Sequence, residues 1–83
     1  MPDVRVRYRV WKTVSRVTGQ RRDIAHWFQD DSGQDRKLPV AQAHAVARGL
    51  ARQHASEAEV VDGTAVLACY VWDRRKKEVV VRG

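Results

Sequence analysis

The sequence predicts an α+β fold in which a single α-helix packs on one face of an antiparallel β-sheet, in the order ββ-α-ββ(β). Residues 4–10 alternate strictly between apolar and basic side chains, which is typical of a strand with one dry face. Apolar side chains recur at three- and four-residue spacing over residues 40–50, which indicates a helix. Residues 64–72 and 78–82 are rich in β-branched and aromatic side chains, which favours further strands. The 83 residues give room for one domain, and we expect residues 1–83 to form it.

The first two strands are expected to form a hairpin. The dry side of the first strand carries Val4, Val6, Tyr8 and Val10. Its wet side carries Arg5, Arg7, Arg9 and Trp11. A second run, Asp23–Phe28, follows the turn signal Thr18-Gly19-Gln20. If those three residues form the loop, the facing pairs are Val17 with Arg21, Val14 with Ile24, Trp11 with Trp27, and Val10 with Phe28. Burial determines this register only weakly.

A polar segment and a helix follow. The composition of Gln29–Lys37 is typical of a turn, and Gln34–Leu38 is the candidate for a short third strand. Pro39 suits the first helical turn, and the helix is expected to end near residues 54–56. Its apolar face is narrow and rich in alanine, so it can approach a sheet closely. Gly49 within it is expected to mark close contact with a strand.

The last part of the chain reads as β-structure. Ala58–Val61 is followed by the turn signal Asp62-Gly63, by the run Thr64–Trp72, and by Glu78–Arg82. Thr64–Trp72 is apolar on both faces, which indicates a strand that is central in its sheet or lies at an interface. Because one helix covers one face only, the other face must stay open, be covered by a second copy, or bind a ligand.

The charge is segregated along the chain, and the net charge is +6. Residues 1–22 carry seven bases and one acid, residues 23–73 carry four bases and eight acids, and residues 74–83 carry five bases and one acid. If the two basic segments fold onto one side, that side attracts polyanions, of which nucleic acid is the commonest. The alternative is a basic surface that only keeps the protein in solution.

Residue patterns for catalysis or metal binding are missing from the sequence. The three histidines lack metal-ligand spacing, and Cys69 is expected to be a small buried residue on the dry face of its strand. The carboxylates of Asp30, Asp31 and Asp35 suit a solvated turn better than a calcium loop. We therefore expect no enzyme, no cofactor and no metal. One cysteine, no signal peptide and no membrane span predict a cytoplasmic protein without a membrane partner.

The candidate nucleic-acid-binding residues combine basic and aromatic side chains. They are Arg5, Arg7, Arg9, Trp11, Arg21, Arg22, Trp27, Arg74, Arg75, Lys76 and Lys77, and Tyr70 and Trp72 are expected to join them if they lie on the same face. Arginine binds phosphate in a bidentate manner, and indole rings stack on exposed bases. The same residue types also suit a protein interface. A third interpretation is that the two tryptophans form a cross-strand pair that only stabilises the sheet.

The layout resembles that of small orphan proteins of actinobacteriophages. It combines the opening strand Tyr8-Arg9-Val10-Trp11, the strand His26-Trp27-Phe28, a polar turn and an alanine-rich helix, in a composition typical of a GC-rich genome. The resemblance covers the style of the whole chain and includes no diagnostic motif. It implies a non-enzymatic protein that binds the nucleoid or a regulator of its bacterial host.

Together these observations predict low-specificity DNA binding through a basic sheet face, with DNA favoured over RNA. The expected setting is the nucleoid in the cytoplasm of a bacterial host, where the protein would be nucleoid-associated or serve host takeover. The alternative is a module that binds a host protein through the same tryptophans and arginines. A homodimer, formed through residues 64–72 or the last strand, is compatible with both.

Overall fold

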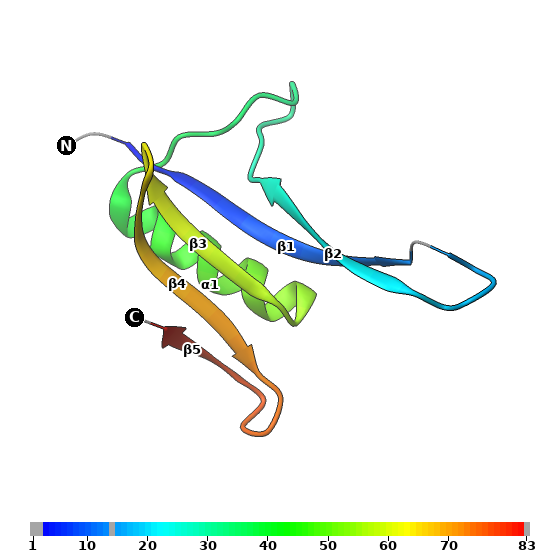
Figure 1. Ribbon diagram of the computed structural model, residues 1–83. Coiled ribbons are helices and arrows are strands. Elements are labelled where there is room, and N and C mark those ends of the chain that lie inside the picture. Colours follow the sequence, from blue (N-terminus) through cyan, green and yellow to red (C-terminus); the bar gives the residue numbers. More distant parts are fainter. Residues whose placement is uncertain (1–2, 14, 83) are drawn as a thin grey trace.

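The computed structural model describes residues 3–13 and 15–82, and it has the predicted α+β fold (Figure 1). Five antiparallel strands form one sheet in the order β2-β1-β3-β4-β5, and the single helix packs on one of its faces. The elements are β1 (Arg5–Thr13), β2 (Arg21–Trp27), α1 (Val40–His54), β3 (Glu57–Asp62), β4 (Ala65–Asp73) and β5 (Glu78–Arg82). Among the described residues, no helix has the length and the apolar character that crossing a membrane requires.

Strands β1 and β2 form the expected hairpin, but the predicted register is wrong by four residues. Val10 pairs with Ile24, Trp11 pairs with Asp23, and Thr13 pairs with Arg21, so facing residue numbers sum to 34. The predicted partners Trp11 and Trp27 therefore do not face each other. An even shift leaves every side chain on its predicted face, which is why the apolar pattern could not detect the error.

The longer loop explains the shift. β1 ends at Thr13 and β2 begins at Arg21, so the connection is longer than the expected three residues 18–20. Gly19 takes a positive φ of 68°, and Val17, which was expected to face Arg21, is 96% exposed in the loop. The position expected for Val14, opposite Ile24, lies outside the described residues.

The segment between β2 and the helix contains no third strand among the described residues. Gln34–Leu38 makes only isolated bridges, from Asp35 to Gln29 and from Leu38 to Val4. The carboxylate of Asp30 accepts hydrogen bonds from the backbone N–H groups of Ser32 and Gln34, at 2.9 and 3.0 Å. This side-chain turn competes with the ladder hydrogen bonds that a strand would need.

Helix α1 lies close to the sheet because its buried face is made of alanine. Ala43, Ala47 and Ala51 are completely buried, and they pack over β1, β3 and β4. Pro39 precedes the first turn with φ −55°, and Ala55 ends the helix in a left-handed conformation with φ 47°. Gly49, in contrast, does not mark close contact with a strand, since no strand atom lies within 4 Å of where its Cβ would be.

The core between helix and sheet is thin. Val4, Val6 and Val60 are its largest completely buried side chains. Tyr70 is 4% exposed and lies beneath the helix, where its hydroxyl is 2.6 Å from Nδ1 of His44. The expectation that Tyr70 and Trp72 share a face with the arginines of β1 is therefore wrong, because both point to the helix side.

Strand β4 has neighbours on both sides, as its two apolar faces predict. Gly63, with φ 61°, turns the chain from β3 into β4, and the register shifts between Val60 and Val61. The expectation that Cys69 is buried on the dry face of its strand is wrong, because its side chain is half-buried on the face opposite the helix. Its neighbours there on β3 are acidic, as described below.

The alanine face of α1 leads to a test by overpacking. Ala47→Leu adds three carbons where no space exists, and we expect it to lower the free energy of unfolding by about 1–3 kcal/mol. Ala45→Leu adds the same atoms at an exposed position of the same helix and should change stability by less than about 0.5 kcal/mol. Urea denaturation followed by tryptophan fluorescence measures both. Equal effects of the two variants would contradict the packing described here.

Candidate nucleic-acid interface

The face of the sheet opposite the helix carries arginines that are already paired with carboxylates. Nη1 of Arg5 lies 3.0 Å from Oδ2 of Asp35, and Nη2 of Arg7 lies 3.0 Å from Oε1 of Glu59. Arg7 and Glu59 face each other across β1 and β3, 52 residues apart in the sequence. A phosphate group would have to compete with these carboxylates for the guanidinium groups.

Glu57 connects the two basic parts of the chain. Its Oε1 lies 2.9 Å from Nε of Arg9, although the N–H of that atom is not directed at the oxygen. Its Oε2 lies 3.9 Å from Nη1 of the more exposed Arg82 on β5. Arg9 also lies 3.4 Å from Oδ2 of Asp23 on β2. The acidic side chains of β3 thus partly neutralise the arginines of the strands on both sides.

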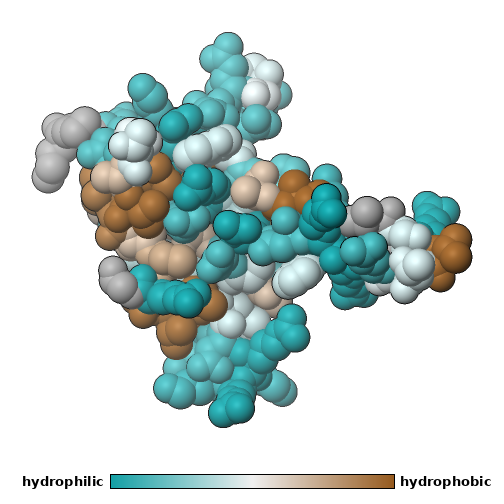
Figure 2. All heavy atoms as spheres, in the orientation of Figure 1, coloured by the Kyte–Doolittle hydropathy of each residue, from teal (hydrophilic) through white to brown (hydrophobic). Residues whose placement is uncertain are grey.

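The two tryptophans of this face differ in how far their rings are free to stack on a partner. The guanidinium carbon of Arg5 lies 4.0 Å from the centre of the Trp27 ring, and that of Arg7 lies 5.4 Å away. Trp11 is 47% exposed and lies four residues away from the Arg7–Trp27 pair along β1. In Figure 2, hydrophilic residues run over the middle of this face, and hydrophobic ones gather where β4 begins and near β5.

Among the described residues, the cations without a carboxylate within 4 Å gather mainly at one end of the sheet. Because the strands are antiparallel, the β1–β2 loop, the β4–β5 turn and the C-terminal end of α1 all lie there (Figure 1). We call residues 12–22 and 74–77 the basic end; they carry no acid and eight cations: Lys12, Arg16, Arg21, Arg22, Arg74, Arg75, Lys76 and Lys77. Exposed acids such as Asp3, Asp31 and Asp62 lie at the opposite end.

The two halves of the basic end flank a notch where β3 is missing. Strand β3 starts only at Glu57, so β1 and β4 extend past it on either side. The notch has a volume of about 310 Å³, and its walls include Trp11 on β1 and Arg74 after β4. Ser56 closes its base: its hydroxyl donates to the carbonyl of Arg9, and its own carbonyl accepts the N–H of Trp72 at 3.0 Å.

The β4–β5 turn is held by Asp73, one of the two acids that flank it, and its four cations are exposed. The carboxylate of Asp73 accepts hydrogen bonds from the backbone N–H groups of Arg75 and Lys76, at 2.9 and 3.1 Å. Lys77 closes the turn in a left-handed conformation, with φ 53°. All four side chains of residues 74–77 are exposed.

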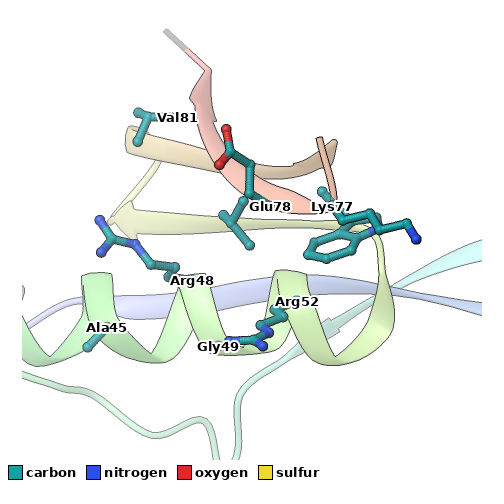
Figure 3. A pocket seen from close by; sticks show the side chains of 9 residues that line it. Ala45, Arg48, Gly49, Arg52, Lys77, Glu78 and Val81 are labelled. Carbon is teal, nitrogen blue, oxygen red and sulfur yellow. The ribbon is translucent and has the colours of Figure 1, made fainter. Parts of the chain in front are cut away.

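A groove between α1 and β5 adds cations that the sequence reasoning missed. Its volume is about 570 Å³, and its lining includes Arg48, Arg52, Lys77 and the apolar Val79 and Val81. Figure 3 shows the Arg48 side chain on the groove side of the helix, and its guanidinium carbon lies 5.4 Å from the centre of the Tyr70 ring on β4. The four-residue spacing of the two arginines on a predicted helix was the available signal, since it places both on one helix face.

The described residues contain no group of three or more His, Cys, Asp or Glu side chains placed to hold a metal ion. The Asp30 carboxylate is engaged within its own turn, and hydrogen bonds from Ser32 lower its pKa. The pKa of the Cys69 thiol is raised, mainly by desolvation and further by the negative charges of Glu57 and Glu59. A raised pKa disfavours the thiolate, so Cys69 is a poor nucleophile here.

Cys69 gives a pH test of this acidic surrounding. Because the native pKa is raised above that of an ordinary thiol, the rise of iodoacetamide alkylation with pH should occur at higher pH in the native protein than in urea. Glu57→Gln removes one negative charge and should move the native profile back towards lower pH. Mass spectrometry of timed samples measures the rates. Coincident native and unfolded profiles would contradict the assignment.

Comparisons with protein-family models, curated proteins and solved structures find no match to this chain. Of the expected site residues, the structure gathers Trp11, Arg21, Arg22 and residues 74–77 around the basic end. It places Arg5, Arg7, Arg9 and Trp27 along the ion-paired face instead.

Proposed function

We propose that this protein is a non-enzymatic DNA-binding protein that grips the phosphate backbone of duplex DNA with its basic end. The observation that carries the proposal is that eight cations, without an acid among them, lie on the two hairpin tips at the same end of the sheet. Phosphate neutralisation by Lys and Arg supplies nearly all the free energy of low-specificity DNA binding. Such a surface therefore needs no built pocket and no base-reading side chains.

The shape of the first hairpin supports duplex DNA as the partner. Beyond Arg9, β1 pairs with β2 alone, so residues 10–13 and 21–24 form a two-stranded ribbon that projects from the sheet (Figure 1). The major groove of B-DNA admits a two-stranded β-ribbon, and basic side chains along the ribbon then face the phosphates on both sides. Arg21 and Arg22 would contact phosphates from β2, and residues 74–77 would contact the DNA backbone from the β4–β5 turn.

The ion-paired face of the sheet has a supporting role in DNA binding. Arg7 and Arg9 hold β1 against β3 and β2, and Arg5 holds it against Asp35 in the segment after β2. All three contribute long-range attraction more than direct phosphate contacts. Trp11 borders the notch beside the ribbon, where it supports the arginines or contacts the duplex. DNA is favoured over RNA because the deep, narrow major groove of A-form RNA excludes such a ribbon.

Salt dependence provides the first test. Six to eight phosphate contacts predict that log K falls against log salt with a slope of about −5 to −7. A gel-shift or fluorescence-anisotropy titration of a random-sequence duplex, at several salt concentrations around 150 mM, measures the slope. Binding that does not weaken with salt, or no binding to DNA at all, would overturn the proposal. Tighter binding to an RNA duplex would overturn the choice of DNA.

Paired charge removals provide the second test. Arg21→Gln with Arg22→Gln, and separately Arg74→Gln with Lys76→Gln, should each raise Kd roughly ten- to thirtyfold at 150 mM salt and reduce the slope by about 2. The matched control is Arg36→Gln with Lys37→Gln, which makes the same charge change at the opposite end of the sheet. We expect this control to change Kd less than about threefold.

The same titration separates the basic end from the sheet face. Arg5→Gln with Arg7→Gln should lower stability more than DNA affinity, because it breaks two ion pairs. If this variant weakens binding more than the basic-end variants do, the phosphates lie on the sheet face instead. If all four double variants weaken binding equally, only net charge matters and the basic end is not a site.

A further inference from the structure

Strand β5 leaves one edge of the sheet open. It pairs with β4 on one side only, and it is the last strand of the order β2-β1-β3-β4-β5. Natural sheets protect such edges with central charges, proline or bulges. β5 has none of these in its centre, because residues 79–81 are three consecutive valines, and Val81 is 61% exposed.

The other edge of the sheet differs. Strand β2 carries Arg21 and Arg22 side by side at its start, and both are exposed. Two copies that paired along β2 would bring further like charges to the shared edge. The β4 strand, whose sequence also suggested an interface, has strands on both sides and offers no free backbone edge. Within the described sheet, β5 is therefore the edge that suits pairing.

The sequence of β5 is complementary to itself when read in the antiparallel direction. With a two-fold axis at Val80, Glu78 of one copy faces the partner's Arg82, and Val79 faces the partner's Val81. The reciprocal contacts follow from symmetry, as in any isologous interface. Opposite charges that face each other across strands stabilise the pairing, and so do β-branched pairs.

The side chains involved are available for these contacts. Glu78 is exposed and makes no ion pair within 4 Å in the described structure. The Arg82 side chain is 74% exposed, and its one carboxylate partner among the described residues, Glu57, lies 3.9 Å away. Figure 3 shows the carboxylate of Glu78 directed away from α1, and Val81 lying beyond the end of Arg48 on the open side of the groove.

We propose that β5 is a homodimer interface in which two copies join their sheets, edge to edge, into one antiparallel ten-stranded sheet. In this register, residues that face each other across the two β5 strands lie on the same face of the joined sheet. The two helices therefore share one face, and Val79 and Val81 of both copies come together on it. The α1–β5 groove of each copy then continues into that of its partner. The two basic ends point in opposite directions, so the dimer would have a cationic tip at each end.

The test uses the purified full chain without nucleic acid, so its result is independent of DNA binding. Sedimentation equilibrium at about 50 µM should give twice the chain mass of 9.5 kDa. Glu78→Arg alone places Arg opposite Arg twice, and Arg82→Glu alone places Glu opposite Glu twice. Each single variant should raise the dimer Kd at least about tenfold. Asp31→Arg, a matched charge reversal far from β5, should leave the dimer intact.

Mixing the two single variants tests the register itself. In a mixed pair, the β5 strand of the first variant carries arginine at both ends, and it would face a β5 strand with glutamate at both ends. Equimolar Glu78→Arg and Arg82→Glu proteins should therefore form a heterodimer, although neither variant dimerises well alone. Circular dichroism of each variant checks that it is folded. A monomeric wild type at about 50 µM, an unchanged Glu78→Arg dimer, or folded single variants that fail to associate on mixing would each overturn the proposal.

Discussion

The ion pairs that Glu57 and Glu59 make on β3 are the interaction on which the arrangement of this protein depends. β1 carries three arginines on one face and β5 ends in another, and β3, which lies between them beside β1, supplies the carboxylates on that face. Exposed ion pairs contribute little individually, typically below about 1 kcal/mol, but a shared network of half-buried pairs with aromatic stacking contributes more. This network also decides which cations remain available to a partner.

The open face of the sheet and the basic end therefore have different chemistry, although the same residue types build both. On the face, each arginine of β1 has a carboxylate within 3.4 Å. At the basic end, two short connections carry cations only. Two acids flank the β4–β5 turn: Asp73 accepts hydrogen bonds from backbone N–H groups, and Glu78 is exposed. A polyanion meets fewer competing carboxylates at the hairpin tips than on the sheet.

Much of the fold could be predicted from local patterns. The alternation over residues 4–10, the helical spacing after Pro39 and the turn at Gly63 located the elements to within a few residues. The hairpin register could not be predicted, because a shift of four residues keeps Ile24 and Val10 on the same face. The ion pairs were also beyond local patterns, since Arg7 and Glu59 meet only through the topology. The basic residues of the candidate site were visible in the sequence, but their division into paired and unpaired groups was not.

The basic end carries eight cations and no acid, whereas the opposite end carries acids and bases together, so the charge is distributed unevenly along the strands. In the field of a polyanion, such an uneven distribution experiences a torque as well as an attraction. The protein would rotate while it is still about a Debye length away, so that its hairpin tips arrive first. The orientation of the protein would thus be set before contact, and fewer collisions would bring the opposite end of the sheet to the polyanion first.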